Sequence, residues 1–97
     1  MRETAFVYML ASYRYGTIYI GVTSNLIRRI YEHRQGWVKG FTKEYDVKRL
    51  VWYEVHTDIM EAIAREKRLK HWKRVWKIDL IQEMNPHWDD LYDDIIK

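Results

Sequence analysis

The sequence predicts an α+β domain in which helices pack against a small three-stranded sheet, in the order β-β-α-β-α-α. Two patterns predict this fold class. Short runs rich in aromatic and β-branched residues occupy residues 6–11, 17–22 and 48–55, as is typical of strands. Longer segments repeat apolar residues every three or four positions, as is typical of amphipathic helices. Because 97 residues can form one modest core, we expect a single domain over residues 1–97.

The first two strands are predicted to form a hairpin. Residues 6–11 and 17–22 are separated by residues 12–16, a connection of hairpin length. In the second strand Tyr19 and Gly21 share one face, because side chains alternate along a strand. Gly21 either leaves open space beside Tyr19, where a ligand or backbone can approach, or meets a packing constraint such as a β-bulge. The sequence leaves both explanations open.

The first helix is predicted over residues 25–34. Asn25 and the two residues before it offer side-chain oxygens that can cap the helix, and Gly36 ends it. Residues 36–46 contain glycines with basic and aromatic neighbours, which suits a loop that lies against a partner. The third strand follows this loop.

Two more helices are predicted after the third strand. Asp58, with Glu61 three residues later, resembles a capping box and opens the second helix. A break near His71 or Lys73 separates it from the third helix, which Pro86 ends. The third helix takes its apolar stripe from Val75, Trp76, Leu80, Ile81 and Met84.

Charged side chains interrupt the apolar stripes of the first two helices. Arg29 and His33 fall along the stripe that Leu26 and Ile30 form, and Glu66 interrupts the apolar face of the second helix. Arginine is almost never buried without a partner. A cation, a carboxylate and the phenols of two strand tyrosines, directed toward one sheet, are groups that phosphodiester chemistry can use.

The net charge of +3 conceals a charge asymmetry along the chain. Residues 1–80 carry sixteen Lys and Arg against nine Asp and Glu, whereas residues 81–97 carry one against five. The basic part is the electrostatic footprint expected of a polyanion binder, although such a charge run is also typical of a solvated helix face. The acidic tail can fold back on this basic face or remain in solution. The predicted nucleic-acid contacts are Lys39, Lys43, Lys70, Lys73 and Lys77.

Composition excludes several classes of protein. The chain has no cysteine, which removes disulfides and zinc–thiolate sites from consideration. No apolar stretch approaches membrane-spanning length, and the N-terminus lacks the apolar run of a secretory signal. We therefore expect a cytoplasmic protein, with the monomer favoured and the oligomeric state open.

Several short motifs occur in a fixed order and spacing. Phe6-Val7-Tyr8 is followed after ten residues by Tyr19-Ile20-Gly21, and then by Asn25-Leu26-x-x-Arg29 and a distant helical Glu66. Further motifs in the same order are Glu32-His33, Gly40-Phe41-Thr42 and Asn85-Pro86-x-Trp88. The ordered set resembles the GIY-YIG nuclease family, and most of all its small single-domain bacterial branch. Phe6 departs from the family pattern, which has glycine there.

The resemblance implies a metal-dependent endonuclease-like domain that hydrolyses DNA phosphodiester bonds and leaves a 5′ phosphate and a 3′ hydroxyl. Glu66 would hold a single divalent ion, Mg²⁺ or Mn²⁺, and Arg29 would neutralise the phosphate oxygens. Tyr19 is favoured over Tyr8 as the general base, with Tyr8 orienting the water or phosphate. Because a phenol is a poor base at its ordinary pKa of about 10, His33 is the candidate proton relay.

Simpler explanations exist for these residues. Tyr8 and Tyr19 can be strand aromatics that pack against helices, and Arg29 with Glu66 can form a buried ion pair. Asn85 either braces the site or is a turn residue before the proline. The alternative function is a nucleic-acid-binding module with the same fold and little or no turnover. DNA is the expected partner, and RNA stays open.

The tryptophans and the remaining histidines divide between core and surface. Trp52 and Trp76 suit the core, whereas Trp37 and Trp88 are predicted to be free to stack on bases. The other histidines lack partners at metal-ligand spacing and are predicted at the surface; they are His56, His71 and His87.

Overall fold

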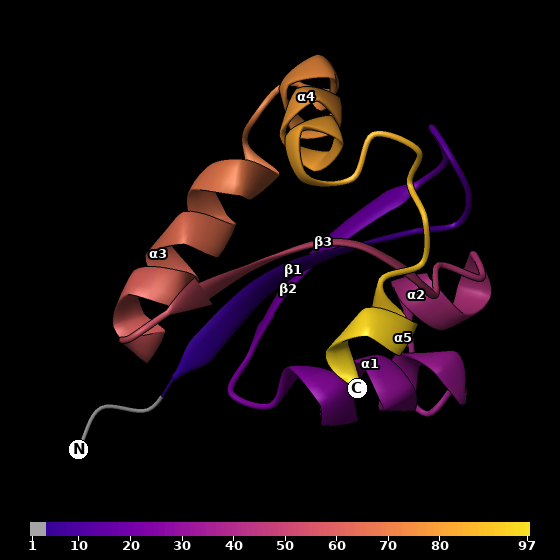
Figure 1. The fold of residues 1–97 in the computed structure, drawn as a ribbon, viewed down its shortest axis with the longest axis horizontal. Coiled ribbons are helices and arrows are strands. Elements are labelled where there is room, and N and C mark those ends of the chain that lie inside the picture. Colours follow the sequence, from indigo (N-terminus) through magenta and orange to yellow (C-terminus); the bar gives the residue numbers. More distant parts are fainter. Residues whose placement is uncertain (1–3) are drawn as a thin grey trace.

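The computed structural model describes residues 4–97 and has the predicted α+β fold (Figure 1). β1 (Ala5–Ala11) is the central strand of an antiparallel sheet, with β2 (Ile18–Thr23) on one side and β3 (Arg49–His56) on the other. Each strand bound lies within one residue of its predicted position. Strand ends commonly vary by this amount, so the sequence pattern located all three strands correctly.

Helices cover both faces of the sheet (Figure 1). α3 (Ile59–Lys70) and α4 (Arg74–Met84) cover one face, and α1 (Leu26–Arg34) covers the other. Two short helices were not predicted, α2 (Phe41–Glu44) and α5 (Tyr92–Ile95), because four residues are too few to show a helical period. Within residues 4–97, no helix is long and apolar enough to cross a membrane.

β1 is buried on both of its faces. Val7 and Met9 pack into the core beneath α3 and α4, which we call the α3-face core. Tyr8 and Leu10 pack into the core beneath α1, which we call the α1-face core. All four residues are at most 1% exposed. Any polar atom that this strand carries therefore needs a partner inside the protein.

The predicted helix starts and the predicted break are confirmed. The side chains of Asn25 and Asp58 each accept a hydrogen bond from a backbone N–H in the first turn of their helix, at 3.1 and 2.9 Å. Both residues have extended backbone angles, as N-caps do. His71 closes α3 and Lys73 opens α4, so the break falls between the two predicted positions.

Two tryptophans have environments opposite to those predicted. Trp76, predicted in the core, is 49% exposed, because α4 turns Ile78 and Ile81 toward the sheet and leaves Trp76 on the opposite side of the helix. Trp88, predicted to be free for stacking, is fully buried in the α3-face core. Its indole N–H donates to the Gln82 side chain at 3.4 Å. Trp88 is therefore a core residue and not a nucleic-acid contact.

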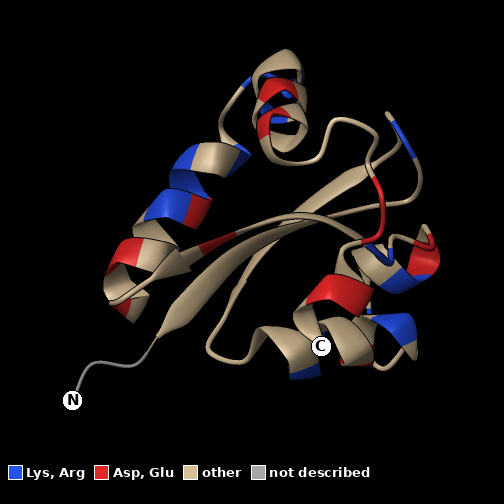
Figure 2. Cartoon of the chain, in the orientation of Figure 1, with Lys and Arg blue, Asp and Glu red and all other residues tan. Residues whose placement is uncertain are grey.

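The acidic C-terminal segment lies on the α1 side of the sheet and away from the basic face of α3 (Figure 2). Asp90 pairs with Arg34 of α1 at 2.6 Å and accepts a hydrogen bond from the Leu50 amide at 3.2 Å. The apolar side chains that anchor this segment in the α1-face core are Leu91, Tyr92 and Ile95. Apolar packing and the Asp90 contacts thus hold the tail in place.

Candidate active site

Tyr8 and Gly21 lie directly opposite each other on β1 and β2. A Cβ atom at position 21 would lie 2.5 Å from both the hydroxyl oxygen and Cζ of Tyr8, far inside van der Waals contact. The phenol ring therefore crosses the β2 backbone at the glycine. Of the two explanations for Gly21, the structure shows the packing constraint, and the partner that requires the space is Tyr8.

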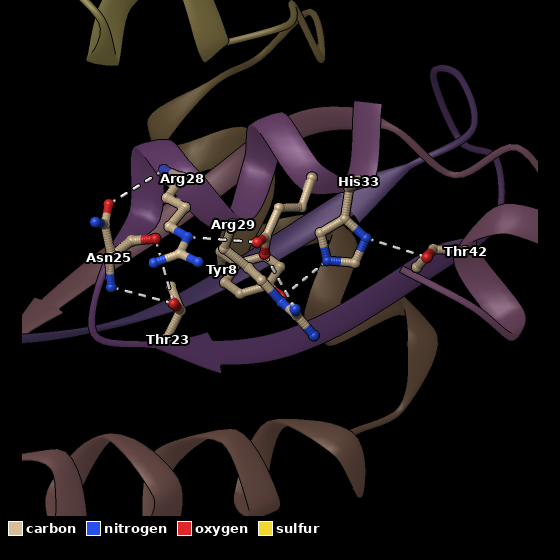
Figure 3. Close-up of polar contacts among 8 residues, drawn as sticks. Tyr8, Thr23, Asn25, Arg28, Arg29, His33 and Thr42 are labelled. Atoms are coloured by element: carbon tan, nitrogen blue, oxygen red, sulfur yellow. Dashed lines mark hydrogen bonds and ion pairs between the residues drawn. The ribbon is translucent and has the colours of Figure 1, made fainter. Parts of the chain in front are cut away.

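The Tyr8 hydroxyl is part of a buried chain of hydrogen bonds (Figure 3). Its oxygen lies 3.0 Å from Nε2 of His33, and Nδ1 of the same imidazole lies 3.1 Å from Oγ1 of Thr42. His33 is 2% exposed and Thr42 is 4% exposed. The chain therefore joins β1, α1 and α2 through polar atoms that are shielded from solvent.

Tyr19 lies beside this chain and is closer to the surface. Its ring centroid is 6.3 Å from that of Tyr8 and 5.6 Å from that of His33, and the side chain is partly exposed. On its other side the exposed Phe41 stacks at 6.4 Å with an interplanar angle of 25°. The structure thus brings both predicted tyrosines and the predicted histidine together on the α1 side of the sheet.

Arg29 lies at the rim of the same site. Its side chain is 38% exposed, and Nη1 donates to Glu32 at 3.3 Å, while Arg28 also reaches Glu32 at 3.4 Å. A polar pocket of about 320 Å³ opens here, lined by Val22, Thr23, Ser24, Asn25, Arg28, Arg29 and Glu32. Arg29 and Glu66 therefore do not form the buried ion pair considered above. We refer to Tyr8, Tyr19, Arg29 and His33 as the Tyr8 cluster.

Burial keeps the two central groups of the cluster neutral. It raises the pKa of Tyr8 well above its usual value, and neighbouring Tyr19 adds to this effect while Arg29 opposes it. Burial also lowers the pKa of His33 to about 4; Arg29 lowers it further and Glu32 opposes the shift. Near neutral pH the site therefore contains a phenol and an uncharged imidazole.

Glu66 comes from the opposite side of the sheet. It lies on α3, pairs with Lys70 at 3.2 Å and is 13% exposed. Arg65 points toward β3, where it donates two hydrogen bonds to Glu54. Consecutive helical residues differ by about 100° around the axis, so Glu66 projects in a different direction from Arg65. In residues 4–97 no hydrogen bond or ion pair joins Glu66 to the Tyr8 cluster.

A divalent ion would have few protein ligands here. Within the described part of the chain, no group of three or more His, Asp or Glu side chains could together hold a metal. Glu66 can still serve as a single carboxylate ligand, because Mg²⁺ keeps most of its water and needs only one or two carboxylates. The donor chemistry thus fits a largely hydrated ion beside Glu66.

Asn85 makes its side-chain hydrogen bonds with backbone groups. Its amide N–H donates to the carbonyls of Val51 at 3.1 Å and Asp89 at 2.8 Å, and its oxygen accepts from the Asp89 amide at 3.0 Å. The side chain is buried at the end of α4. These bonds fix the turn that follows α4, which is the turn role considered for Asn85 above.

The predicted lysine contacts form two groups (Figure 2). Lys70, Lys73 and Lys77 lie around the junction of α3 and α4; Lys70 pairs with Glu66, and the Lys73 ammonium lies 5.4 Å from the Trp76 ring centroid. Lys39 and Lys43 are exposed near α2, in a segment that also exposes aromatic rings. Those rings are Trp37, Phe41 and Tyr45.

Thr42 and Glu32 were not predicted as functional residues, although both lie within motifs that carry the family resemblance. Thr42, which contacts His33, lies in a short helix that has no periodic pattern. Glu32 is four residues after Arg28 and three after Arg29, and it pairs with both. The spacing of Glu32 could have indicated its ion pairs, because residues three and four apart are neighbours on a helix. No local pattern could have indicated the Thr42 contact.

The paired hairpin tyrosine and glycine, with His33 and Arg29 brought to the same side by α1, form the centre of a small α+β domain. The model of the GIY-YIG catalytic domain matches residues 4–79, and the chain belongs to the GIY-YIG family. This confirms the resemblance that the motif order indicated.

Similar proteins carry the name UPF0213. The chain is 32% identical to a UPF0213 protein of Staphylococcus epidermidis over 70% of this chain and 83% of that protein. A UPF0213 protein of Bacillus pumilus is also 32% identical, over 71% of this chain and 70% of that protein. The solution NMR structure of a UPF0213 protein from Bacillus halodurans has a TM-score of 0.56 and 28% identity, covering 90% of this chain and 92% of that one.

The buried His33 predicts a specific pH dependence of stability. Its folded pKa of about 4 is below the unfolded value of 6.5, so the unfolded chain binds the proton more readily. The free energy of unfolding is therefore highest above pH 6.5 and decreases as the pH falls toward 4. Protonation of His33 accounts for a total decrease of about 3 kcal/mol. Denaturant unfolding of wild type and His33→Gln across this range should show the loss in wild type and not in the variant. The exposed His71→Gln serves as the control and should follow wild type; equal curves for wild type and His33→Gln would contradict the prediction.

Proposed function

We propose that the protein is a metal-dependent endonuclease that hydrolyses DNA phosphodiester bonds at the Tyr8 cluster. The observation that carries the proposal is the meeting of two phenols, a neutral imidazole and a half-exposed guanidinium on one side of the sheet. Hydrolysis of a phosphodiester needs a deprotonated water, neutralised phosphate oxygens and a stabilised leaving group. The cluster offers a residue type for the first two of these needs.

Tyr19 is proposed to hold the attacking water and, in its deprotonated form, to accept the proton of that water. It is the more exposed of the two phenols, whereas Tyr8 is buried and its raised pKa keeps it protonated. A buried neutral phenol suits the orientation of a water or a phosphate better than proton abstraction. The hydrogen bond of His33 on this side goes to Tyr8, so His33 would act on Tyr19 through Tyr8.

Arg29 is proposed to bind the non-bridging phosphate oxygens. Its guanidinium remains charged, and Glu32 holds it at the wall of the polar pocket. Glu66 is proposed to hold Mg²⁺ or Mn²⁺ at the β2 edge, where the bound ion supplies Lewis-acid stabilisation of the phosphate and the leaving 3′ oxygen. The products would be a 5′ phosphate and a 3′ hydroxyl.

The second candidate is a nucleic-acid-binding module with little turnover. The observation that favours it is the ion pair between Glu66 and Lys70, together with the location of Glu66 across the sheet from the Tyr8 cluster. A module of this kind would bind nucleic acid equally well with and without the Glu66 carboxylate. Cleavage assays with matched variants separate the two functions.

Glu66→Ala is expected to abolish cleavage and leave binding nearly unchanged. The side chain makes one pair with the half-exposed Lys70, so the free energy of unfolding should change by less than about 1 kcal/mol. The assay measures cleavage of duplex, branched and single-stranded DNA, and of RNA, with Mg²⁺ or Mn²⁺. Glu61→Ala, an exposed glutamate of the same helix, is the control and should remain active. Wild-type binding without cleavage of any of these substrates would support the binding module instead.

The two tyrosines are expected to respond differently to removal of the hydroxyl. Tyr19→Phe should lower turnover by a factor on the order of 10² to 10⁴ with little change in stability, because the ring and its packing remain. Tyr8→Phe should lower turnover less and should lower the free energy of unfolding by about 1–2 kcal/mol, because His33 then has no buried partner at Nε2. Rates against pH and denaturant unfolding of both variants measure this. An inactive Tyr8→Phe beside an active Tyr19→Phe would reverse the two roles.

Replacement of Lys70, Lys73 and Lys77 by Gln tests which surface binds DNA. If the α3–α4 junction is the footprint, the logarithm of affinity should depend less steeply on the logarithm of salt concentration, by about 0.9 for each phosphate that is no longer neutralised. The comparison protein carries Lys39→Gln and Lys43→Gln, on the α2 side. If only the Lys39→Gln and Lys43→Gln protein shows a weaker salt dependence of affinity, the DNA-binding surface is at residues 36–46 instead.

A further inference from the structure

We infer that Thr42 is a positioning residue, whose hydroxyl donates to Nδ1 of His33 and fixes the imidazole as the tautomer with hydrogen on Nε2. The tautomer follows from the geometry of the free protein, whereas its consequence for catalysis rests on the proposed function. This tautomer sets the direction of each hydrogen bond in the chain that joins α2, α1 and β1.

A neutral imidazole has one donor nitrogen and one acceptor nitrogen. Both nitrogens of His33 are engaged, Nδ1 with Thr42 at 3.1 Å and Nε2 with Tyr8 at 3.0 Å. If one bond has the imidazole as acceptor, the other must have it as donor. The direction of the Thr42 bond therefore decides the direction of the Tyr8 bond.

The surroundings of Thr42 decide that first direction. Its carbonyl accepts the Val47 amide at 2.8 Å, which fixes the backbone, and its side chain is 4% exposed. Among the hydrogen bonds of residues 4–97, the Thr42 hydroxyl takes part in the bond with Nδ1. A buried hydroxyl costs free energy unless its hydrogen is donated, and Nδ1 is the acceptor in place.

The titratable and charged groups near His33 do not supply another partner for Nδ1. Tyr8 comes from β1 and contacts Nε2, and Tyr19 comes from β2 and approaches the ring. Arg29 and Glu32, from the helix of His33 itself, pair with each other at the rim. Thr42 is therefore the group in contact with Nδ1.

With hydrogen on Nε2, the imidazole donates to the Tyr8 oxygen. The hydrogen of the Tyr8 hydroxyl is then available for an acceptor on the open side of the phenol, either the Tyr19 oxygen or the attacking water. The chain runs in one direction, from the Thr42 hydroxyl through His33 to Tyr8 and into the site. In this arrangement Tyr8 orients the reacting groups by donating a hydrogen bond.

The test is nitrogen-15 NMR of the histidine rings in the whole protein without substrate. Ring nitrogen shifts and two-bond couplings identify the tautomer, and His33→Gln identifies the His33 signals. Wild type and Thr42→Ser should show a single tautomer with hydrogen on Nε2. Thr42→Val keeps the shape of the side chain and removes the hydroxyl, so it should lose this single tautomer.

Turnover gives a second readout. Thr42→Val should lower kcat about 10-fold to 100-fold with little change in KM. Losses of this size are typical when a group that orients a functional histidine in a metalloenzyme is removed. Thr42→Ser should restore kcat to within a few-fold of wild type. A merely structural role would instead lower stability equally in both variants and leave the His33 tautomer unchanged.

Hydrogen on Nδ1 in wild type, or an unchanged tautomer in Thr42→Val, would overturn the inference. Should Thr42→Val fail to fold, the spectra of wild type and Thr42→Ser still decide the direction of the chain. Because the tautomer is read without substrate, failure of every form to cleave would count against the proposed function alone. The two conclusions can therefore fail separately.

Discussion

The structure depends on the burial of one tyrosine hydroxyl in the central strand. β1 is covered on both faces, so the partner of Tyr8 has to come from the protein, and leaving the hydroxyl unpaired would cost about 1–3 kcal/mol. Gly21 lets the ring cross β2, and His33 supplies the partner. His33 in turn requires Thr42. Four positions on four elements are thereby coupled, and a change at any of them disturbs the other three.

This coupling produces a neutral interior with a charged rim. Burial disfavours the phenolate of Tyr8 and the imidazolium of His33 and holds both groups uncharged, while Arg29 stays half exposed beside Glu32. A phosphodiester that approached from solvent would meet the guanidinium before the neutral groups. The division of charge is therefore consistent with the proposed roles, in which Arg29 binds phosphate and the phenols act on the water.

The sheet itself sets the position of Glu66. Tyr8 and Tyr19 point to the α1 side, whereas α3, the helix that carries Glu66, packs on the other side of the sheet. The edge strand β2 is where groups from the two faces of a sheet can approach a common ligand, since beyond it the described sheet has no further strand. In the proposed enzyme, the substrate phosphate and the hydrated ion would meet at this edge.

The sequence by itself determined the three strands, the three longer helices, the N-caps of the first two of these helices and the residues of the Tyr8 cluster. Alternation and helical spacing are local patterns, and the motif order indicated the family. The tertiary structure decided what local patterns cannot encode. Thr42, which contacts His33, lies in a four-residue helix that is too short to show a helical period. Trp88 is buried because the turn fixed by Asn85 returns it to the core. Likewise, helical spacing identified Glu66 as unusual, but only the packing of α3 showed on which side of the sheet it lies, because the face that a helix covers depends on contacts distant in sequence.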